Sequence, residues 1–311
     1  MTTAPPDRSH IATEKRNPRT MHLHTLSARE IVDLIHQEDR EVQHAMKRAG
    51  KVITRFIEAA EPGFIAGGRL VYVGAGTSGR LGVLDASEAP PTFQVEPGRV
   101  VGIIAGGDAA LRKSSEGMED DPRGAWPELE KLTLTAQDTV LAIAAGGTTP
   151  YALGALDFCK QLPEGSRPVT GLLVCTTIDH PPTADHLIIL KTGPEVLTGS
   201  TRMKAGTATK LTLNTISTTL MVRSGRVYQN LMVDVRATND KLRDRAARIV
   251  ATLTGLSREA SFELLDRAGG AVKTAVMMHL RHMDRSAADR ALGASRGSLA
   301  AALGGAAPEA V

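Results

Sequence analysis

Residues 70–92 constrain the fold of this 311-residue chain more than any other segment. Their first four residues, LVYV, are an apolar run that predicts a buried β-strand. A glycine-rich turn, GAGTSG at residues 74–79, follows directly, and the residues after it predict a short helix that stops at Pro90. A strand that enters a helix through such a turn offers backbone N–H groups and hydroxyls to an anion. The segment therefore predicts a phosphate site, with one acid, Glu88, at the far end of the same helix.

GAGTSG also matches the G-x-G-x-x-G pattern of dinucleotide-binding turns. Such turns are followed, about 20 residues on, by an acidic residue where the second strand ends. Here the next strand-like run, residues 100–104, precedes two glycines and then Asp108, which comes too late. Thr77 and Ser78 also bring hydroxyls to positions that a dinucleotide turn leaves to the backbone. A sugar phosphate therefore fits this turn better than a dinucleotide.

Short β-type runs alternate with helical stretches through the middle of the chain. This alternation predicts an α/β fold with a doubly wound, mostly parallel five-stranded sheet. Aromatic residues make up only 3% of the chain, which suits a core of small aliphatic side chains between strands and helices. The predicted strands are residues 70–73, 100–104, 139–144, 170–175 and 187–190, and a long helix is expected over residues 198–222.

Three regions are expected along the chain. Residues 1–20, rich in proline, threonine and charge, predict a mobile N-terminal arm. Residues 21–240 hold the sheet domain with its N-terminal helices, the first of which starts at the capping box Ser27-x-x-Glu30. Residues 241–311 predict a small module of three helices, the last one opened by the acidic capping variant Ser286-x-x-Asp289.

Hydroxyl-rich turns follow or flank the strands at three places, and we expect them to bind substrate. Serine and threonine also cap helices without binding a ligand, and a lysine in such a turn is equally explained as a surface residue. Three such turns in one sheet protein nevertheless favour phosphate and hydroxyl binding. The residues are Thr77 and Ser78 in the first turn, Gly146, Gly147, Thr148 and Thr149 in the second, and Ser200, Thr201 and Lys204 in the third.

Two acidic positions accompany these turns, Glu88 and Glu119. Two carboxyl groups in different environments can divide the roles of general acid and general base. From spacing alone, Glu116, Asp120 and Asp121 compete with Glu119, and a solvated acidic surface also explains the cluster. The residues by themselves leave the choice of the pair open.

Several functional classes are disfavoured by composition. A net charge of +3 with both signs interspersed does not suit a nucleic-acid-binding protein. Two cysteines fit neither a metal site nor a disulfide framework, and no histidine pair has the neighbours of a metal site, so we expect no metal. No apolar stretch reaches 18 residues and no signal-peptide pattern is present, so we expect a cytoplasmic enzyme without a membrane partner.

Several longer strings closely resemble the N-acetylmuramic acid 6-phosphate etherase family. They are GAGTSGRLGVLDASEAPPTF, IAGGD, EGMEDD, PEVLTGSTRMKAGTATKLTLN and NLMVDVRATNDKL, and the resemblance extends from TEKRNPRT to the C-terminal helices. It implies a sugar isomerase (SIS) domain of flavodoxin-like topology, a homodimer, and no metal or cofactor. The implied activity cleaves the D-lactyl ether of N-acetylmuramic acid 6-phosphate to N-acetylglucosamine 6-phosphate and (R)-lactate, in cell-wall amino-sugar recycling.

The resemblance also implies roles for single residues. Glu88 and Glu119 match the acid–base pair of the family, and Thr77, Ser78 and Thr149 match its phosphate ligands. We assign Glu119 as the base that removes the C2 proton of the open-chain sugar, and Glu88 as the acid that protonates the lactyl oxygen. An acid must hold its proton at neutral pH, so we expect Glu88 to be partly buried.

The second turn departs from the family pattern Ser-Gly-Arg-Thr-Pro. It reads GGTTP at residues 146–150, so a serine hydroxyl and an arginine are missing, although backbone N–H groups of a glycine turn can still bind phosphate. Two other functions stay open: a non-catalytic SIS sugar-phosphate sensor, like the glucokinase regulatory protein, and a SIS aldose–ketose isomerase. The presence of both glutamates argues against a sensor, and the PPT and TGSTRMK strings favour the etherase.

Overall fold

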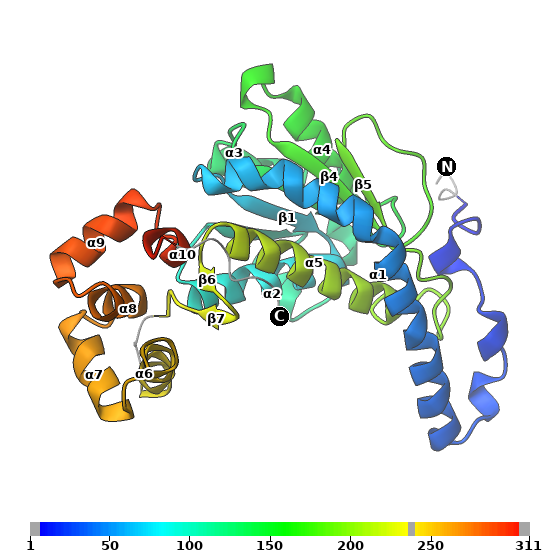
Figure 1. Ribbon diagram of the computed structural model, residues 1–311. Helices are drawn as coiled ribbons and strands as arrows, with labels where there is room; N and C mark the ends of the chain where they lie inside the picture. Colours follow the sequence, from blue (N-terminus) through cyan, green and yellow to red (C-terminus); the bar gives the residue numbers. More distant parts are fainter. Residues whose placement is uncertain (1–6, 236–239, 305–311) are drawn as a thin grey trace. The chain divides into compact units, whose positions relative to one another are not determined.

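The computed structural model describes residues 7–235 and 240–304 (Figure 1). The chain forms two compact units, Met1–Ser87 with Gly98–Ser217 and Glu88–Pro97 with Thr218–Val311. The domain boundary expected at residue 240 thus lies inside the second unit. Among the described helices, none combines the length and the apolar character needed to cross a membrane.

Five parallel strands form the centre of the first unit, in the order β2-β1-β3-β4-β5 (Figure 1). Each predicted apolar run became a strand, so the expected parallel five-stranded α/β sheet is confirmed. Because β1 lies between β2 and β3, the chain leaves β1 toward one edge and returns on its other side, and ligands of such sheets bind at this switch point. The strands are β1 (Leu70–Gly74), β2 (Val100–Ile104), β3 (Thr139–Ile143), β4 (Val169–Val174) and β5 (His186–Ile189).

Helices cover both faces of this sheet, because successive side chains of β1 point alternately to one face and the other and are buried on both. Val71 and Val73 pack in one apolar cluster with Leu129 of α3 (Trp126–Leu132) and with residues of α4 (Pro150–Gln161). The intervening Tyr72 points to the opposite face, where its hydroxyl donates to Asp85 of α2 (Gly76–Phe93) at 2.9 Å. That face also carries α1 (Ala28–Ile65) and the first part of α5 (Lys204–Arg223). Short 3₁₀ turns span Ala12–Glu14, Pro18–Thr20, Leu23–Thr25, Gly107–Leu111, Glu116–Met118 and Glu164–Ser166.

Helix starts were predicted better than helix ends. The capping box is present: Glu30 N–H donates to the Ser27 hydroxyl, and the Glu30 carboxylate accepts from Ser27 N–H at 2.7 Å. The predicted stop of α2 at Pro90 is wrong, because the helix continues through both prolines to Phe93. Proline has a helix-compatible φ and here removes only the two N–H groups that would donate to the Ala86 and Ser87 carbonyls, in the last turns of the helix.

The N-terminal segment packs against the first unit from Ile11 onward. Ile11, Thr13, Asn17 and Thr20 are buried, although they lie within the arm expected to be mobile; residues 1–6 of that arm lie outside the described residues. Ala12 N–H donates to the Thr176 hydroxyl at 3.2 Å. This part of the N-terminal segment therefore lies beside the end of β4.

The second unit contains a short hairpin and a helical module. Its apolar core includes Val272, Ala275, Val276, Met277 and Met278 of α8, and the expectation of a helical C-terminal part is confirmed. The module has more helices than the three expected, and the start of α9 differs: Asp284, not Ser286, caps it by accepting from Ala287 N–H. The elements are β6 (Val227–Tyr228), β7 (Leu231–Met232), α6 (Asp240–Thr254), α7 (Arg258–Arg267), α8 (Val272–Leu280), α9 (Arg285–Ala294) and α10 (Leu299–Ala302).

Candidate functional site

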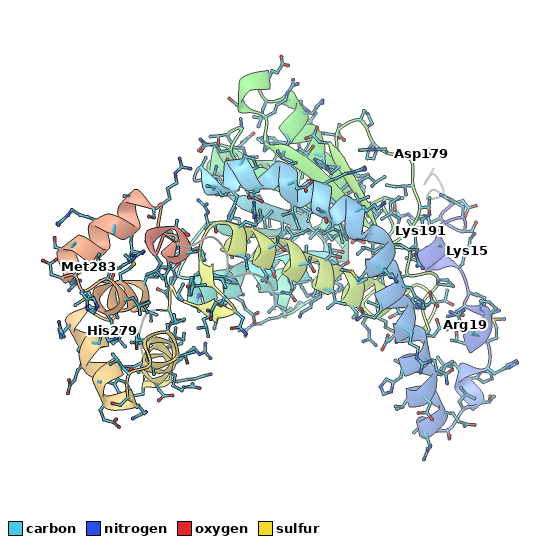
Figure 2. All side chains as sticks on the ribbon, in the orientation of Figure 1. Lys15, Arg19, Asp179, Lys191, His279 and Met283 are labelled. Carbon is cyan, nitrogen blue, oxygen red and sulfur yellow. The ribbon has the colours of Figure 1, made fainter. Side chains whose placement is uncertain are left out.

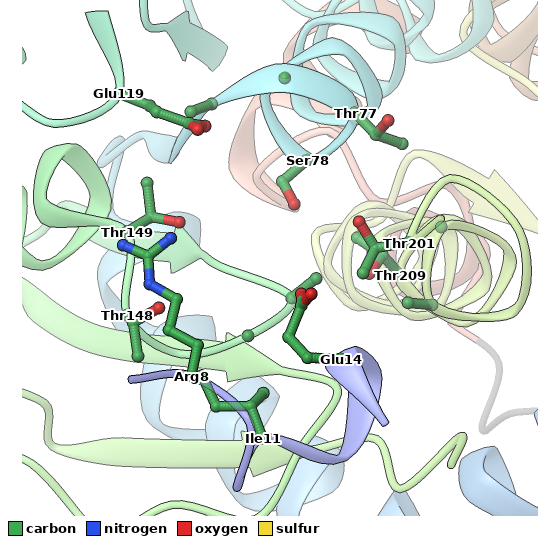
Figure 3. A pocket seen from close by; sticks show the side chains of 16 residues that line it. Arg8, Ile11, Glu14, Thr77, Ser78, Glu119, Thr148, Thr149, Thr201 and Thr209 are labelled. Carbon is green, nitrogen blue, oxygen red and sulfur yellow. The ribbon is translucent and has the colours of Figure 1, made fainter. Parts of the chain in front are cut away.

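A cavity of the first unit lies at the carboxyl ends of β1 and β3, where the topology places a ligand (Figure 3). Segments distant in sequence meet there: the turns after the two strands, the start of α5, the N-terminal segment and the loop that carries Glu119. The lining residues are Arg8, Ile11, Glu14, Ala75, Gly76, Thr77, Ser78, Glu119, Ala145, Gly146, Thr148, Thr149, Thr201, Ala205, Gly206 and Thr209.

The first turn leads into α2, and its residues 75–78 line the cavity. The helical hydrogen bonds begin with Gly79 N–H donating to Ala75 at 3.1 Å, so the N–H groups of the preceding residues have no acceptor within the helix. Together with the helix dipole they favour an anion beside the hydroxyls of Thr77 and Ser78. A side chain at Gly79 would lie 2.6 Å from the Gly74 carbonyl oxygen, so glycine is required where the helix leaves the strand.

The second turn holds Thr149 at the start of α4 without using its side chain as a cap. Thr149 occupies the N-cap position, yet its hydroxyl makes no capping hydrogen bond. Helix capping therefore does not explain why a threonine stands at this position. Gly147 has a φ of 73° and, unlike its neighbours in the turn, does not line the cavity. Thr148 is exposed at the cavity wall.

In the third turn, a carboxylate of the same chain occupies the start of the helix. The buried Glu195 carboxylate accepts from Lys204 N–H at 3.0 Å and from Ala205 N–H at 2.8 Å, so it occupies the start of α5 as an internal anion. Burial raises the pKa of Glu195 even though these two N–H groups favour its charged form. Thr201 lines the cavity, whereas Ser200 does not.

Lys204, expected to bind substrate, has a different partner. Its side chain is fully buried, and its ammonium donates to Glu38 of α1 at 2.6 Å. Arg19, labelled in Figure 2 on the segment before α1, and Asn17 also donate to this carboxylate. Burial alone would raise the pKa of Glu38, but the hydrogen bonds from Arg19, Lys204 and Asn17 outweigh it and lower the pKa to about 2. Lys204 therefore neutralises a buried charge and does not line the cavity.

Glu119 is brought to the cavity by its own backbone. Its carbonyl accepts from Tyr151 N–H in the first turn of α4 at 3.0 Å, which fixes this loop beside the second turn. The side chain is half-buried and lines the cavity, whereas the neighbouring Asp120 and Asp121 are exposed and do not line it. Position thus separates Glu119 from two of the acids that competed with it in the sequence.

Glu88 is exposed, so the partial burial expected for it is not provided by the chain described here. It lies on α2 eleven residues after Thr77, which corresponds to about 16 Å along the helix axis. Most of α2 therefore separates Glu88 from the first turn. It is not among the residues that line the cavity.

Nine lining residues were not among the predicted site residues: Arg8, Ile11, Glu14, Ala75, Gly76, Ala145, Ala205, Gly206 and Thr209. The first three belong to the segment expected to be a mobile arm. Glu14 falls within the TEKRNPRT string, the one signal that pointed to this segment. Among the described residues, no group of three or more histidine, cysteine or carboxylate side chains is arranged to hold a metal ion.

Comparison with known proteins identifies the family of the chain. Residues 33–160 match the family model of the glucokinase regulatory protein N-terminal SIS domain. The chain is 50% identical over 299 residues to the N-acetylmuramic acid 6-phosphate etherase of Gloeobacter violaceus and 49% identical over 298 residues to that of Trichormus variabilis, with 96% of each chain covered. It is 48% identical over 296 residues to the Pectobacterium atrosepticum protein of the same name, covering 94% of this chain and 96% of that one. The chain therefore belongs to the N-acetylmuramic acid 6-phosphate etherase family.

Proposed function

We propose that this protein cleaves the D-lactyl ether of N-acetylmuramic acid 6-phosphate, giving N-acetylglucosamine 6-phosphate and (R)-lactate in cell-wall amino-sugar recycling. The observation that supports it best is the half-buried Glu119 in one cavity with two hydroxyl-rich helix starts. Such a cavity suits a phosphate ester whose sugar carbons need a base.

In the proposed reaction, Thr77, Ser78 and Thr149 hold the 6-phosphate of the open-chain sugar. Its aldehyde acidifies the C2 proton, which Glu119 removes as general base. The C3–O bond then breaks with its electron pair on the lactyl oxygen, and Glu88 protonates that oxygen. Water adds to C3 of the unsaturated aldehyde, and C2 regains a proton, which completes the N-acetylglucosamine 6-phosphate.

The direct test is incubation of the protein with N-acetylmuramic acid 6-phosphate and an assay for lactate. Release of lactate with N-acetylglucosamine 6-phosphate supports the proposal. Binding without lactate release indicates a sugar-phosphate sensor, and conversion of an aldose phosphate to its ketose indicates an isomerase. Glu119 at the cavity favours chemistry over sensing.

Isotopes distinguish elimination and hydration from direct displacement at C3. In D₂O, elimination followed by hydration places deuterium at C2 of the product, whereas displacement retains the original hydrogen. Water labelled with ¹⁸O should label the C3 hydroxyl and leave lactate unlabelled, because the C3–O bond breaks. A control with added N-acetylglucosamine 6-phosphate excludes later exchange. Product with its C2 hydrogen fully retained would exclude exchange of the abstracted proton with solvent.

We further propose that the enzyme is a cytoplasmic homodimer in which a second copy supplies Glu88. A hexose phosphate anchored at Thr77 is much shorter than the stretch of α2 that leads to Glu88 of the same chain. An exposed acid on one copy is also available to the other. Contact with the second copy would provide the burial that an acid needs at neutral pH.

Mixing two inactive variants tests this arrangement. Glu88→Gln and Glu119→Gln dimers are co-refolded or exchanged and then assayed for lactate release. If each site combines residues of both copies, half of the mixed population carries one intact site per dimer, and roughly a quarter of wild-type activity returns. A mixture that stays inactive although mass spectrometry shows mixed dimers would place both glutamates of a site on one chain.

A further inference from the structure

The cavity holds little positive charge for a ligand that carries two negative charges. Its lining includes two carboxylates, Glu14 and Glu119, and among the described residues that line it Arg8 is the one cation. Helix starts and hydroxyls stabilise a phosphate, but a guanidinium adds charge-assisted hydrogen bonds that are about twice as strong as neutral ones.

Two other sources of positive charge are unavailable. Lys204 is fully buried against Glu38. The second turn has Thr148 where the family pattern has arginine. The need for a cation is therefore not met from the elements where the sequence suggested it.

Arg8 reaches the second turn from the N-terminal segment. Figure 3 shows its guanidinium directed toward Thr149, with Thr148 close to the stem of the side chain. The position of the segment is fixed by several contacts: Ile11 N–H donates to the Arg8 carbonyl at 3.0 Å, Ile11 is buried, and Ala12 is bonded to Thr176. The methyl group of Ile11 lies 3.8 Å from where a side chain at Gly146 would begin. The N-terminal segment and the second turn are thus adjacent.

We propose that Arg8 binds the 6-phosphate of the substrate and supplies the positive charge that the second turn, GGTTP at residues 146–150, does not carry. The proposal rests on the proposed function for the identity of the substrate, but not for the binding of phosphate. It assigns a substrate-binding role to a residue of the first ten, which local patterns left in a mobile arm. The planar fork of arginine suits two phosphate oxygens at once, which lysine cannot match.

The first experiment compares Arg8→Ala with Arg16→Ala, a matched control that removes an exposed arginine of the same segment outside the cavity. For Arg8→Ala we expect KM for N-acetylmuramic acid 6-phosphate to rise about 10- to 100-fold, with kcat changed much less. The dissociation constant of inorganic phosphate, measured by calorimetry, should rise by a similar factor, whereas inhibition by lactate should not change. Arg8→Lys should recover only part of the affinity, and Arg16→Ala should match the wild type.

The second experiment restores the family pattern. Thr148 is exposed, so Thr148→Arg can place a guanidinium at the second turn without displacing core residues. In the Arg8→Ala background, this change should return KM and phosphate affinity to within a few-fold of the wild type. A double variant as weak as Arg8→Ala would show that the two guanidiniums do not serve the same phosphate, and the proposal would be wrong.

The outcomes separate this proposal from the proposed function. Unchanged phosphate affinity in Arg8→Ala overturns the role of Arg8, whatever the wild type does with the substrate. Weaker inhibition by lactate with unchanged phosphate affinity also overturns it, because Arg8 would then bind the lactyl carboxylate. If the wild type released no lactate, the proposed function would fail, and the phosphate titrations would still decide the role of Arg8.

Discussion

The starts of α2 and α5 look alike in the sequence but differ in the structure. Both follow turns rich in glycine, serine and threonine. At α2 the first N–H groups face the cavity, whereas at α5 the Glu195 carboxylate already accepts from two of them. Lys204, the cation of the α5 turn, is likewise bound to Glu38. One helix start is open to an external anion, and the other is filled by an internal one.

The difference arises from residues that are distant from the local motif. A helix start favours an anion in either case, because its first N–H groups have no acceptor within the helix and the dipole is positive at that end. Whether that anion is substrate or protein depends on whether a carboxylate from elsewhere reaches it first. Removing a side-chain group that faces the cavity at the open sites should therefore alter catalysis or KM, and removing a charged group at the filled site should alter stability.

The largest effect is expected at Glu119, beside the open sites. Glu119→Gln removes the proposed base while keeping the shape of the side chain, so kcat should fall about 10²- to 10⁴-fold with little change in melting temperature. Lactate release and thermal unfolding measure the two effects. Asp120→Asn, next to it but outside the cavity, is the control. A Glu119→Gln enzyme that kept more than about a tenth of wild-type turnover would not fit a general base.

Lys204→Met tests the filled site. It removes the ammonium but keeps the length of the side chain, and leaves Glu38 buried with less compensation. We expect unfolding free energy to fall by about 3–5 kcal/mol, nearer the lower value because Arg19 and Asn17 still donate to Glu38. Denaturant unfolding measures this, with Lys210→Met on the exposed side of α5 as control. A stable variant with a raised KM would instead place Lys204 in substrate binding.

The same cluster should make the protein sensitive to acid. The pKa of Glu38 is lowered from 4.5 to about 2 in the folded chain, so its contribution is complete above about pH 4.5 and is lost as pH falls toward 2. The full shift corresponds to about 3 kcal/mol. Unfolding free energy measured from pH 6 to pH 3 should fall more steeply for the wild type than for Glu38→Gln. Equal slopes would show that other carboxyl groups account for the acid sensitivity.

Thr149→Val sharpens the comparison within the open sites. Its hydroxyl makes no capping bond, so its loss should be felt by the phosphate rather than by α4. A hydrogen bond to a charged group contributes about 1.5–3 kcal/mol, so KM should rise about 10- to 100-fold. Thr148→Val should have a smaller effect on KM. If melting temperature fell while KM stayed constant, Thr149 would belong with the structural helix starts.

The smallest effect is expected for Gly146→Ser, which restores the serine of the family pattern. A side chain there would begin 3.8 Å from Ile11 and 4.0 Å from the Thr13 hydroxyl, which is buried without a hydrogen-bond partner among the described residues. The new hydroxyl can pair with it, and unfolding free energy should rise by about 1 kcal/mol. Gly147→Ser is the contrasting change, since its positive φ and the nearby Ile178 should make it destabilising. A destabilised Gly146→Ser would mean that the segment cannot adjust.

Local signals in the sequence were sufficient for the sheet and for the open turns. Short apolar runs that alternate with helical stretches predicted all five strands, and ligands of such sheets are expected at the carboxyl ends of the strands. The box at Ser27 was readable because its two partners lie three residues apart. The stop of α2 at Pro90 was wrong because a proline forbids a hydrogen bond but not the helical φ.

Long-range pairs could not be read in this way. Lys204 and Glu38 are 166 residues apart, and a lysine in a hydroxyl-rich turn looks the same whether it meets substrate or a buried carboxylate. Arg8 and Glu14 sit in a polar segment without periodicity, so nothing local connects them with the turns after β1 and β3. The number of residues between Thr77 and Glu88 could be counted in the sequence. That Glu88 does not line the cavity of its own chain became clear only once the cavity was located.

The contact between Ala12 and Thr176 spans 164 residues and sets an order of events during synthesis. Residues 8–14 leave the ribosome long before the strands and turns against which they pack. At about 5–20 residues per second, roughly 10–40 s pass before Thr209, the last residue of the cavity wall, has been added. During that time Arg8 and Ile11 are accessible to proteases and to any peptide fused before them. Cleavage within this segment would remove Arg8 and Ile11, two residues of the cavity wall.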